Sequence, residues 1–179
     1  MKSKLPDTLH SRHALILGAS GGIGRASALA LAANGVADHF TLTYGGNAKR
    51  VHELAEELRD NHGAHAKVAQ LSFPLSDDRV PHFESFLSSA VDIADFEISI
   101  MVNCIGDSPN VPLETQTLAG ENGWERIFAV HLFSAFLVTR AMPQRMAFRD
   151  IHGSVVLVGS SNGDNSYADY SLPYDLAKG

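Results

Sequence analysis

The sequence predicts an α/β protein built on a doubly wound parallel sheet. Short apolar runs typical of strands alternate along the chain with longer stretches in which apolar residues recur at helical spacing. This alternation is typical of a parallel sheet with helices on both faces. A cluster of glycines from Gly18 to Gly24 closes the first apolar run and opens the first helical stretch. No linker, repeat or low-complexity tract interrupts the pattern, so residues 1–179 are interpreted as one domain.

Each predicted strand is a short apolar or β-branched run that glycine, proline or polar residues end. A helical stretch with an apolar face follows each strand. Pro143 lies inside the longest helix and is expected to kink or end it. The predicted strands are 13–18, 39–44, 66–71, 97–103 and 154–159, and the predicted helices are 22–34, 47–61, a segment after Asp78, 123–147 and a last one that begins near 171–174.

Composition and charge exclude several classes of protein. Hydrophobic residues make up 45% of the chain and charged residues 19%, so a sizeable core is expected and intrinsic disorder is not. The net charge of −6 argues against bulk binding to nucleic acid or to an anionic membrane. No apolar run approaches the length of a bilayer span. Cys104 is the only cysteine, which agrees with a reducing cytoplasm, the expected location.

The nine histidines raise the question of a metal site. His10 and His13 form one close pair, and His62 and His65 form another. Neither pair joins a cysteine or carboxylate set with a recognisable ligand spacing. We therefore expect no metal and interpret these histidines as solvated loop residues.

The first candidate site is the turn after the first strand, Gly18-Ala19-Ser20-Gly21-Gly22-Ile23-Gly24. Glycine lets the backbone take conformations that other residues resist, and it lets a pyrophosphate come close. The helix that follows offers free N–H groups and the positive end of its dipole to the same phosphates. By itself, such a cluster also fits a plain strand-to-helix turn. The candidate cofactor-binding residues here are Gly18, Ser20, Gly21, Gly22, Ile23 and Gly24.

The end of the second strand indicates which dinucleotide is bound. Proteins that prefer NAD usually present an acidic side chain there to the ribose hydroxyls, but no acid occurs between Phe40 and His52. A 2′-phosphate is therefore tolerated, and we expect NADP(H) to be favoured over NAD(H). The cations that follow also fit solvated charges in the first turn of a helix. The candidate residues are Tyr44, Asn47, Lys49 and Arg50.

The end of the fourth strand carries two further candidates. Asn103 can brace the neighbouring backbone, and Gly106 can pass close to a cofactor. Cys104 is interpreted as a small buried apolar residue. Because the carboxyl ends of parallel strands meet at one edge of the sheet, where ligands bind, we expect these residues and the glycine cluster to form one site.

A Tyr–Lys pair on the last helix predicts proton transfer. Tyr174 and Lys178 are four residues apart and share a face. A free phenol has a pKa of about 10, and a nearby ammonium lowers it, so the phenol can exchange a proton nearer neutrality. Ser161 is expected to hold the substrate oxygen. A Tyr–Lys pair at this spacing also occurs on many surface helices. Ser160 is the alternative to Ser161, and Tyr167 and Tyr170 are the alternatives to Tyr174.

With these motifs in this order, the chain resembles the short-chain dehydrogenase/reductase family, especially members similar to 3-oxoacyl-carrier-protein reductase. The resemblance covers nearly the whole chain. It implies a Rossmann-like fold, with Tyr174 as acid/base, Lys178 on the nicotinamide ribose and Ser161 orienting a carbonyl. It also implies subunits paired through the long helix and the last one. The motifs are the glycine cluster, Asn103 to Gly106, Trp124 to His131, Ser160-Ser161 and Tyr174 to Lys178.

The chain departs from the family pattern at four points. Leu17 stands where the family usually has Thr. Pro74 stands where an Asp contacts adenine, and the next residue, Leu75, is included as a candidate cofactor contact. His131 replaces an Asn that links the lysine to a proton-relaying water. Because an imidazole donates, accepts and titrates, His131 is a candidate catalytic residue. The sequence also stops one residue after Lys178, so we expect a fragment with an exposed sheet edge and no substrate lid.

The leading hypothesis is an NADP(H)-dependent oxidoreductase that moves a hydride between nicotinamide and a small-molecule carbonyl or secondary alcohol. The alternative is a catalytically impaired dinucleotide-binding or regulatory protein, which His131, Pro74 and the early stop favour. A lyase or epimerase on the same scaffold also stays open. The long helix is apolar over more than one face, which predicts a homodimer or homotetramer. The residues behind that prediction are Ile127, Phe133, Phe136, Arg140 and Ala141.

Overall fold

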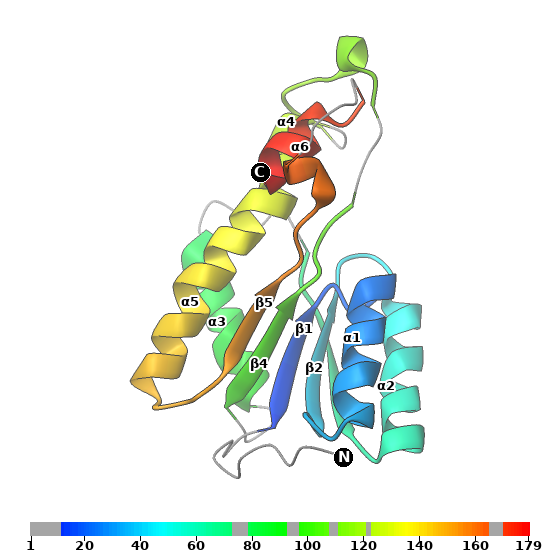
Figure 1. The fold of residues 1–179 in the computed structure, drawn as a ribbon, viewed down its shortest axis with the longest axis vertical. Coiled ribbons are helices and arrows are strands. Elements are labelled where there is room, and N and C mark those ends of the chain that lie inside the picture. The colour runs from blue at the N-terminus through cyan, green and yellow to red at the C-terminus, as the bar shows by residue number, and fades with distance from the viewer. Residues whose placement is uncertain (1–11, 73–78, 93–96, 108–110, 121–122, 165–169) are drawn as a thin grey trace.

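The computed structural model of the 179-residue chain describes residues 12–72, 79–92, 97–107, 111–120, 123–164 and 170–179. At its centre is a five-stranded parallel sheet in the order β3-β2-β1-β4-β5 (Figure 1). The strand order reverses between β1 and β4, which is the place where such sheets open a crevice at the carboxyl ends of their strands. The strands are β1 (His13–Leu17), β2 (His39–Tyr44), β3 (His65–Gln70), β4 (Ile98–Asn103) and β5 (Ser154–Leu157).

Helices cover both faces of the sheet, so the doubly wound fold class is confirmed. One face carries α1 (Gly22–Ala33) and α2 (Ala48–His62), and the other carries α3 (Arg79–Asp92) and α5 (Ser134–Phe148) (Figure 1). The predicted limits of these elements lie within two residues of the observed ones. Beyond the carboxyl ends of the strands lie α4 (Trp124–Phe128), α6 (Leu172–Lys178) and two 3-10 turns, η1 (Leu113–Thr115) and η3 (Ser161–Gly163).

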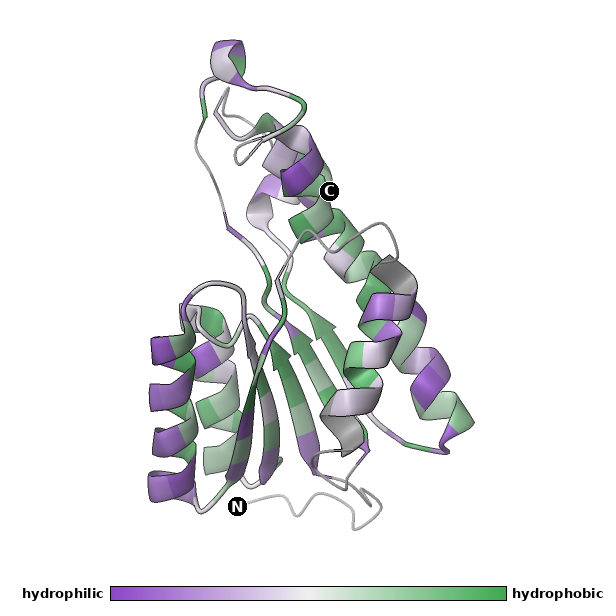
Figure 2. Cartoon of the chain, turned by 180° about the vertical axis from the view of Figure 1, so that it is seen from behind, coloured by the Kyte–Doolittle hydropathy of each residue, from purple (hydrophilic) through white to green (hydrophobic). Residues whose placement is uncertain are grey.

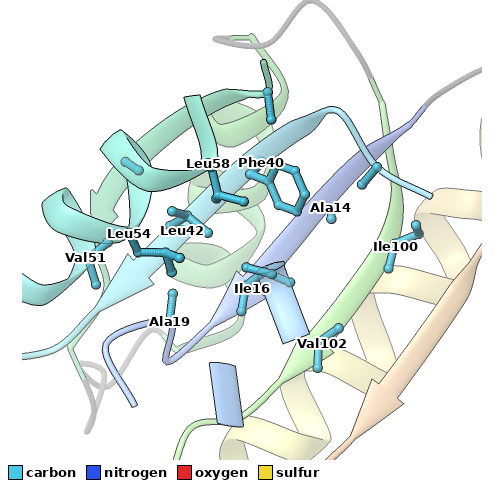
Figure 3. Packing of buried hydrophobic residues seen from close by; sticks show 14 residues of the cluster. Ala14, Ile16, Ala19, Phe40, Leu42, Val51, Leu54, Leu58, Ile100 and Val102 are labelled. Carbon is cyan, nitrogen blue, oxygen red and sulfur yellow. The ribbon is translucent and has the colours of Figure 1, made fainter. Parts of the chain in front are cut away.

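The first hydrophobic core lies between the sheet and the pair α1 and α2. Val51, Leu54 and Leu58 recur at helical spacing along α2 and are at most 1% exposed. The outer side of α2 is hydrophilic (Figure 2), so the helix is amphipathic as its sequence predicts. The three side chains pack toward strand residues such as Phe40 (Figure 3). Ala28 of α1 is fully buried in the same core, and its small side chain lets α1 approach the sheet closely.

The second core lies under α3 and α5. Phe83 from α3 and Leu137 from α5 pack there with Leu15 and Leu17 of β1. Ile16, between those two leucines, faces the first core instead. Because side chains alternate between the two faces of a strand, β1 is buried on both sides. This two-sided burial explains why its sequence is a continuous apolar run and not an alternating one.

The predicted helix 123–147 is present, but one turn of it is not α-helical. α4 leads into a π-helical turn, η2 (Ala129–Phe133), which leads into α5. Pro143 does not end the helix, because α5 continues to Phe148. The proline removes the helical donor to the Thr139 carbonyl, but both residues are exposed, so water can take the donor's place.

The helical run from Trp124 to Phe148 is, by length and composition, long and apolar enough to cross a membrane. The sequence analysis had found no apolar run of that length. However, Leu137, Val138 and Met142 pack from this run onto the sheet and are at most 2% exposed. A helix that covers a central sheet meets the same criteria, so the run is weak evidence for a membrane span.

Strand β5 forms one edge of the sheet. Its ladder partner among the described strands is β4, and Val156 and Leu157 are 47% and 41% exposed. Among the described residues, this edge of the sheet therefore presents backbone groups outside any ladder together with exposed apolar side chains.

Histidines occupy the first position of three neighbouring strands, at the end of the sheet opposite the crevice. His13, His39 and His65 are register partners. The His39 and His65 rings stack with centroids 4.9 Å apart, and His39 Nδ1 lies 2.9 Å from Asp38 Oδ1. His13 is fully buried, with Nε2 2.9 Å from Thr41 Oγ1. The interpretation as loop residues is therefore wrong for His13 and His65, and also for His62, which ends α2. His10 lies outside the described residues. In the described parts of the chain, no group of three potential ligands is placed to hold a metal.

Candidate functional site

The crevice at the carboxyl ends of β1 and β4 holds a cavity of about 280 Å³. The turns after β1 and β2 and the segment after β4 form its wall, and glycines from all three leave backbone accessible to a ligand. α4 and η2 complete the wall. The glycines are Gly18, Gly21, Gly45, Gly46 and Gly106, and the other lining residues are Ser20, Leu71, Cys104, Ile105, Asp107, Arg126 and Val130.

Close packing explains the glycines after β1. Gly18 has a φ of 76°, and a Cβ on it would lie 2.9 Å from the Cys104 carbonyl oxygen. A Cβ on Gly24 would lie 2.5 Å from the Gly18 carbonyl oxygen. Gly21 precedes α1 without a side-chain cap, so the first N–H groups of that helix, from Gly22 and Ile23 onward, remain available to an anion. The turn therefore fits a pyrophosphate.

The turn after β2 places the predicted phosphate-binding residues at the start of α2. Asn47 caps the helix, because its side-chain oxygen accepts a hydrogen bond from Arg50 N at 3.2 Å. The Lys49 ammonium lies 3.8 Å from a Glu53 carboxylate oxygen, and the Arg50 side chain is exposed. Tyr44 ends β2 and is half-buried. The two cations thus lie on the surface in the first turn of α2, and neither is among the described residues that line the cavity.

Asn103 holds the segment after β4. Its Oδ1 accepts a hydrogen bond from Ile105 N at 3.1 Å, and its Nδ2 donates to Ser134 Oγ at 3.3 Å. Ser134 opens α5, so the amide ties the end of β4 to the long helix. Gly106 follows in the cavity wall, and a Cβ on it would lie 2.9 Å from His131 Cε1.

Cys104 lines the cavity and is half-buried, not fully buried as expected. Burial raises the pKa of its thiol, and the Ser27 hydroxyl and the Lys178 ammonium oppose that shift without cancelling it. A thiol with a raised pKa is a poor nucleophile at neutral pH. The interpretation of Cys104 as a packing residue is consistent with this environment.

The Tyr–Lys pair lies on α6, beyond the carboxyl edge of the sheet (Figure 1). Tyr174 is half-buried. Lys178 donates a hydrogen bond from Nζ to the Val158 carbonyl oxygen at 2.9 Å, which holds the ammonium against the end of β5. Burial lowers the pKa of Lys178.

Asp175 anchors α6 next to η3. It is 2% exposed, and its carboxylate accepts hydrogen bonds from Asn162 Nδ2 and Ser171 Oγ, each at 2.8 Å. Ser160 caps η3 by accepting a hydrogen bond from Asn162 N, whereas Ser161 is exposed. The hydroxyl of Ser161 is therefore the freer of the two. The sequence analysis missed Asp175, although it lies between Tyr174 and Lys178.

His131 lies at the centre of the π-helical turn. Its side chain is completely buried, and neither ring nitrogen has a hydrogen-bond partner among the described residues. Its ring meets the Tyr174 ring edge-on, with centroids 4.8 Å apart and planes at 90°. Nε2 lies 3.5 Å from Asp107 Oδ1, which is longer than a regular hydrogen bond. The structure thus brings together two residues, Tyr174 and His131, that were predicted from separate motifs.

Asp107 connects His131 with the cavity wall. Its half-exposed carboxylate forms an ion pair with Arg126, and both residues line the cavity. The nearness of His131, and after it that of Arg126, outweighs burial and lowers the pKa of Asp107 to about 2. The sequence analysis singled out neither Asp107 nor Arg126. An acid directly after Gly106 was the available signal.

Two sequence candidates, Leu75 and Tyr167, lie outside the described residues. The rival Tyr170 is 54% exposed. Its carbonyl oxygen accepts a hydrogen bond from Val111 N at 3.1 Å, so its backbone holds the loop after β4. Of the tyrosines in the described part of the last segment, Tyr174 is the one that contacts His131.

Comparison with known protein families decides the family of this chain. The family described as short chain dehydrogenase matches residues 12–179. The chain belongs to the short-chain dehydrogenase family. This short-chain dehydrogenase is 27% identical over 175 residues to L-xylo-3-hexulose reductase of Hypocrea jecorina, an alignment that covers 93% of this chain and 57% of the relative. It is 31% identical over 157 residues to a sorbose reductase of Schizosaccharomyces pombe, covering 87% and 57%. The chain thus spans under three fifths of these relatives.

Solved structures show the same fold as this short-chain dehydrogenase. Acetoin dehydrogenase from Enterobacter cloacae superposes with a TM-score of 0.78 at 20% identity, covering 94% of this chain and 62% of that one. A short-chain dehydrogenase from Sphingobium yanoikuyae, solved in complex with NADPH, superposes with a TM-score of 0.74 at 26% identity, covering 93% and 60%. The Rossmann-like fold expected from the sequence is confirmed.

Proposed function

We propose that this short-chain dehydrogenase is an NADP(H)-dependent oxidoreductase that moves a hydride between nicotinamide and the carbon of a carbonyl or secondary alcohol. One observation carries the proposal: the glycine turn after β1 and the Tyr174 helix lie at the same carboxyl edge of the sheet. This shared edge supports a dinucleotide site with a proton donor beside it. The reductases among the relatives and the NADPH complex of the Sphingobium yanoikuyae short-chain dehydrogenase support this choice.

The residues of the crevice fit a dinucleotide. The backbone of Gly18, Ser20 and Gly21, which line the cavity, would hold the pyrophosphate. Gly106 leaves room beside the segment after β4, and Lys178 would hold the nicotinamide ribose with the Nζ hydrogens that Val158 does not use. The bound nicotinamide supplies or accepts the hydride.

Tyr174 is the proposed acid/base. In the direction of reduction, its hydroxyl gives a proton to the carbonyl oxygen as that oxygen gains charge. Lys178, one helical turn away, favours the phenolate that remains. Ser161 donates a hydrogen bond to the same oxygen, and its exposed hydroxyl is available for that role. His131 supports the Tyr174 ring from the buried side.

The test of the cofactor preference is a fluorescence titration with NADPH and with NADH at one salt concentration. A charge-assisted contact to the 2′-phosphate contributes about 1.5–3 kcal/mol, which is roughly tenfold to a hundredfold in affinity. NADPH is expected to bind more tightly by that factor. Replacing Lys49 and Arg50 together by Ala should remove most of the preference, whereas Arg59→Ala, at the other end of α2, should leave it. Equal affinities in the unmodified protein would contradict the charge argument.

The test of the acid/base assignment is Tyr174→Phe, with Tyr170→Phe as the matched control. The rate at which a panel of ketones is turned over, followed by nicotinamide absorbance, should fall at least about a hundredfold in the first variant, the usual contribution of a general acid. The control should keep its activity.

A second candidate function, a dinucleotide-binding protein without catalysis, is favoured by His131 at the usual Asn position. Tight NADPH binding by an unmodified protein without turnover on any ketone would select that candidate.

We also propose that the full-length protein is a homodimer or homotetramer. Of the helix residues that predicted assembly, Ile127 and Ala141 are buried in the core and cannot contribute, which corrects that part of the prediction. Phe136, however, is 50% exposed, and Leu132, one turn before it, is 41% exposed. Light scattering should show an oligomer that Phe136→Glu dissociates, and a stable monomer at micromolar concentration would refute the proposal.

A cytoplasmic location stays a prediction.

A further inference from the structure

The π-helical turn creates an arrangement that the proposed reaction leaves unexplained. Three consecutive residues, Ala129, Val130 and His131, are buried there. A π turn widens the helix by one residue, and such turns are frequent at functional sites. Burying an imidazole without hydrogen bonds is costly, yet both His131 nitrogens lack partners among the described residues. Some interaction must offset that cost.

The Asp107 carboxylate lies close to His131 Nε2, with Oδ1 at 3.5 Å. On its other side this carboxylate pairs with Arg126 of α4. Tyr174 approaches the ring from α6, and a Cβ built on Gly106 would lie 3.2 Å from Nδ1. The Nδ1 side of the ring is therefore close to Gly106, and Nε2 lies near a negative charge.

We propose that Asp107 is a positioning residue that holds the His131 ring in one orientation and in its Nε2–H tautomer, and so fixes the Tyr174 ring for proton transfer. A carboxylate is only an acceptor, so the ring nitrogen that faces it must carry the hydrogen. Arg126 fixes the carboxylate in turn. The chain of contacts runs Arg126, Asp107, His131, Tyr174, from the cavity wall to the proposed acid/base. Only the last step, the consequence for catalysis, rests on the proposed function.

The test is the ¹⁵N spectrum of the histidine rings in the purified chain at pH 8.5, above the ordinary histidine pKa of about 6.5. The His131 signals are assigned by their loss in His131→Asn. The unmodified protein should show mainly the Nε2–H tautomer. Asp107→Asn, which keeps the shape and removes the charge, should lower the ratio of Nε2–H to Nδ1–H by about tenfold, the effect of losing one charge-assisted contact. An amide can still accept a hydrogen bond, so Asp107→Ser should lower the ratio at least as far.

Asp60→Asn is the matched control, since Asp60 is exposed on α2 and its replacement removes the same charge. Its His131 tautomer ratio should equal that of the unmodified protein. A ratio unchanged in both Asp107 variants would overturn the proposal, and Asp107→Ser serves alone if Asp107→Asn does not fold. In the same samples, the Asp107 variants should lower kcat, measured at saturating NADPH. If the unmodified protein binds NADPH and turns over no ketone, the proposed function fails while the tautomer result still stands.

Discussion

The contact between Gly106 and His131 predicts a specific coupling between the two positions. A Cβ added to Gly106 would lie 2.9 Å from His131 Cε1 and 3.2 Å from Nδ1. The ring cannot give way, because it is completely buried between Asp107 and Tyr174. The backbone of Gly106 does not have positive φ, so Gly106→Ala adds only the clash.

Overpacking of this kind costs about 1–3 kcal/mol. For a chain of this size, each kcal/mol lowers Tm by about 2–4 °C, so Gly106→Ala should lower Tm by roughly 2–12 °C. The cost should largely disappear in a His131→Asn background, because the shorter amide leaves room for the methyl group. The expected coupling between the two substitutions is about 1–2 kcal/mol, within the range known for residues in contact.

Urea unfolding of the unmodified protein, the two single variants and the double variant measures the coupling. Gly45→Ala is the matched control, since nothing lies within 4 Å of its Cβ position in the same cavity wall. It should change the free energy of unfolding by less than about 0.5 kcal/mol. Costs that add within about 0.5 kcal/mol would refute the reasoning and show that the ring moves freely.

Three further predictions concern the same framework. Gly24→Ala places a Cβ 2.5 Å from the Gly18 carbonyl oxygen, so it should lower stability by at least about 1 kcal/mol and abolish NADPH binding in a fluorescence titration, whereas Gly22→Ala, whose Cβ meets nothing within 4 Å, should fold normally. Because the pKa of Asp107 falls from 3.8 unfolded to about 2 folded, its stabilisation is present above about pH 4 and is lost as pH falls toward 2. The free energy of unfolding, measured in urea from pH 6 to pH 2.5, should therefore fall less steeply with pH in Asp107→Asn. The difference should be no more than about 1 kcal/mol after solvent screening. Leu58→Ala removes a side chain with no exposure and should cost about 2–5 kcal/mol in the same assay.

The strand and helix pattern could be predicted because the buried face of each element carries apolar residues at the spacing of a strand or a helix. β1 is buried on both faces and is therefore a continuous apolar run, and the stripe along α2 begins at Val51 and ends at Leu58. The π-helical turn could not be predicted from spacing. A turn that admits one extra residue leaves a continuous apolar helix pattern almost unchanged, and only the contacts of His131 reveal it.

The site was predictable in part for a related reason. Its glycines and its Tyr–Lys pair form local motifs, so Gly18, Tyr174 and Lys178 could be named from the sequence. Asp107 and Arg126 are separated by 19 positions and by a loop, and their pairing depends on how α4 folds back over the strand ends. A tertiary contact of that kind produces no repeating pattern in the sequence. The burial of Ile127, in contrast to the exposure of Phe136, likewise depends on how the long helix is turned on the sheet.

The aligned histidines at the first positions of β1, β2 and β3 have a consequence for how the molecule responds to acid. Protonation of both stacked rings would place two positive charges about 5 Å apart on neighbouring strands. The Asp38 carboxylate beside His39 is shared with Arg12. β3 borders the solvent at that edge of the sheet, so it should part from β2 before the strands around the crevice separate. Amide exchange in mildly acidic solution should accordingly begin near His65 and reach the β1–β4 ladder last. Unfolding in acid is therefore expected to start at this end of the sheet.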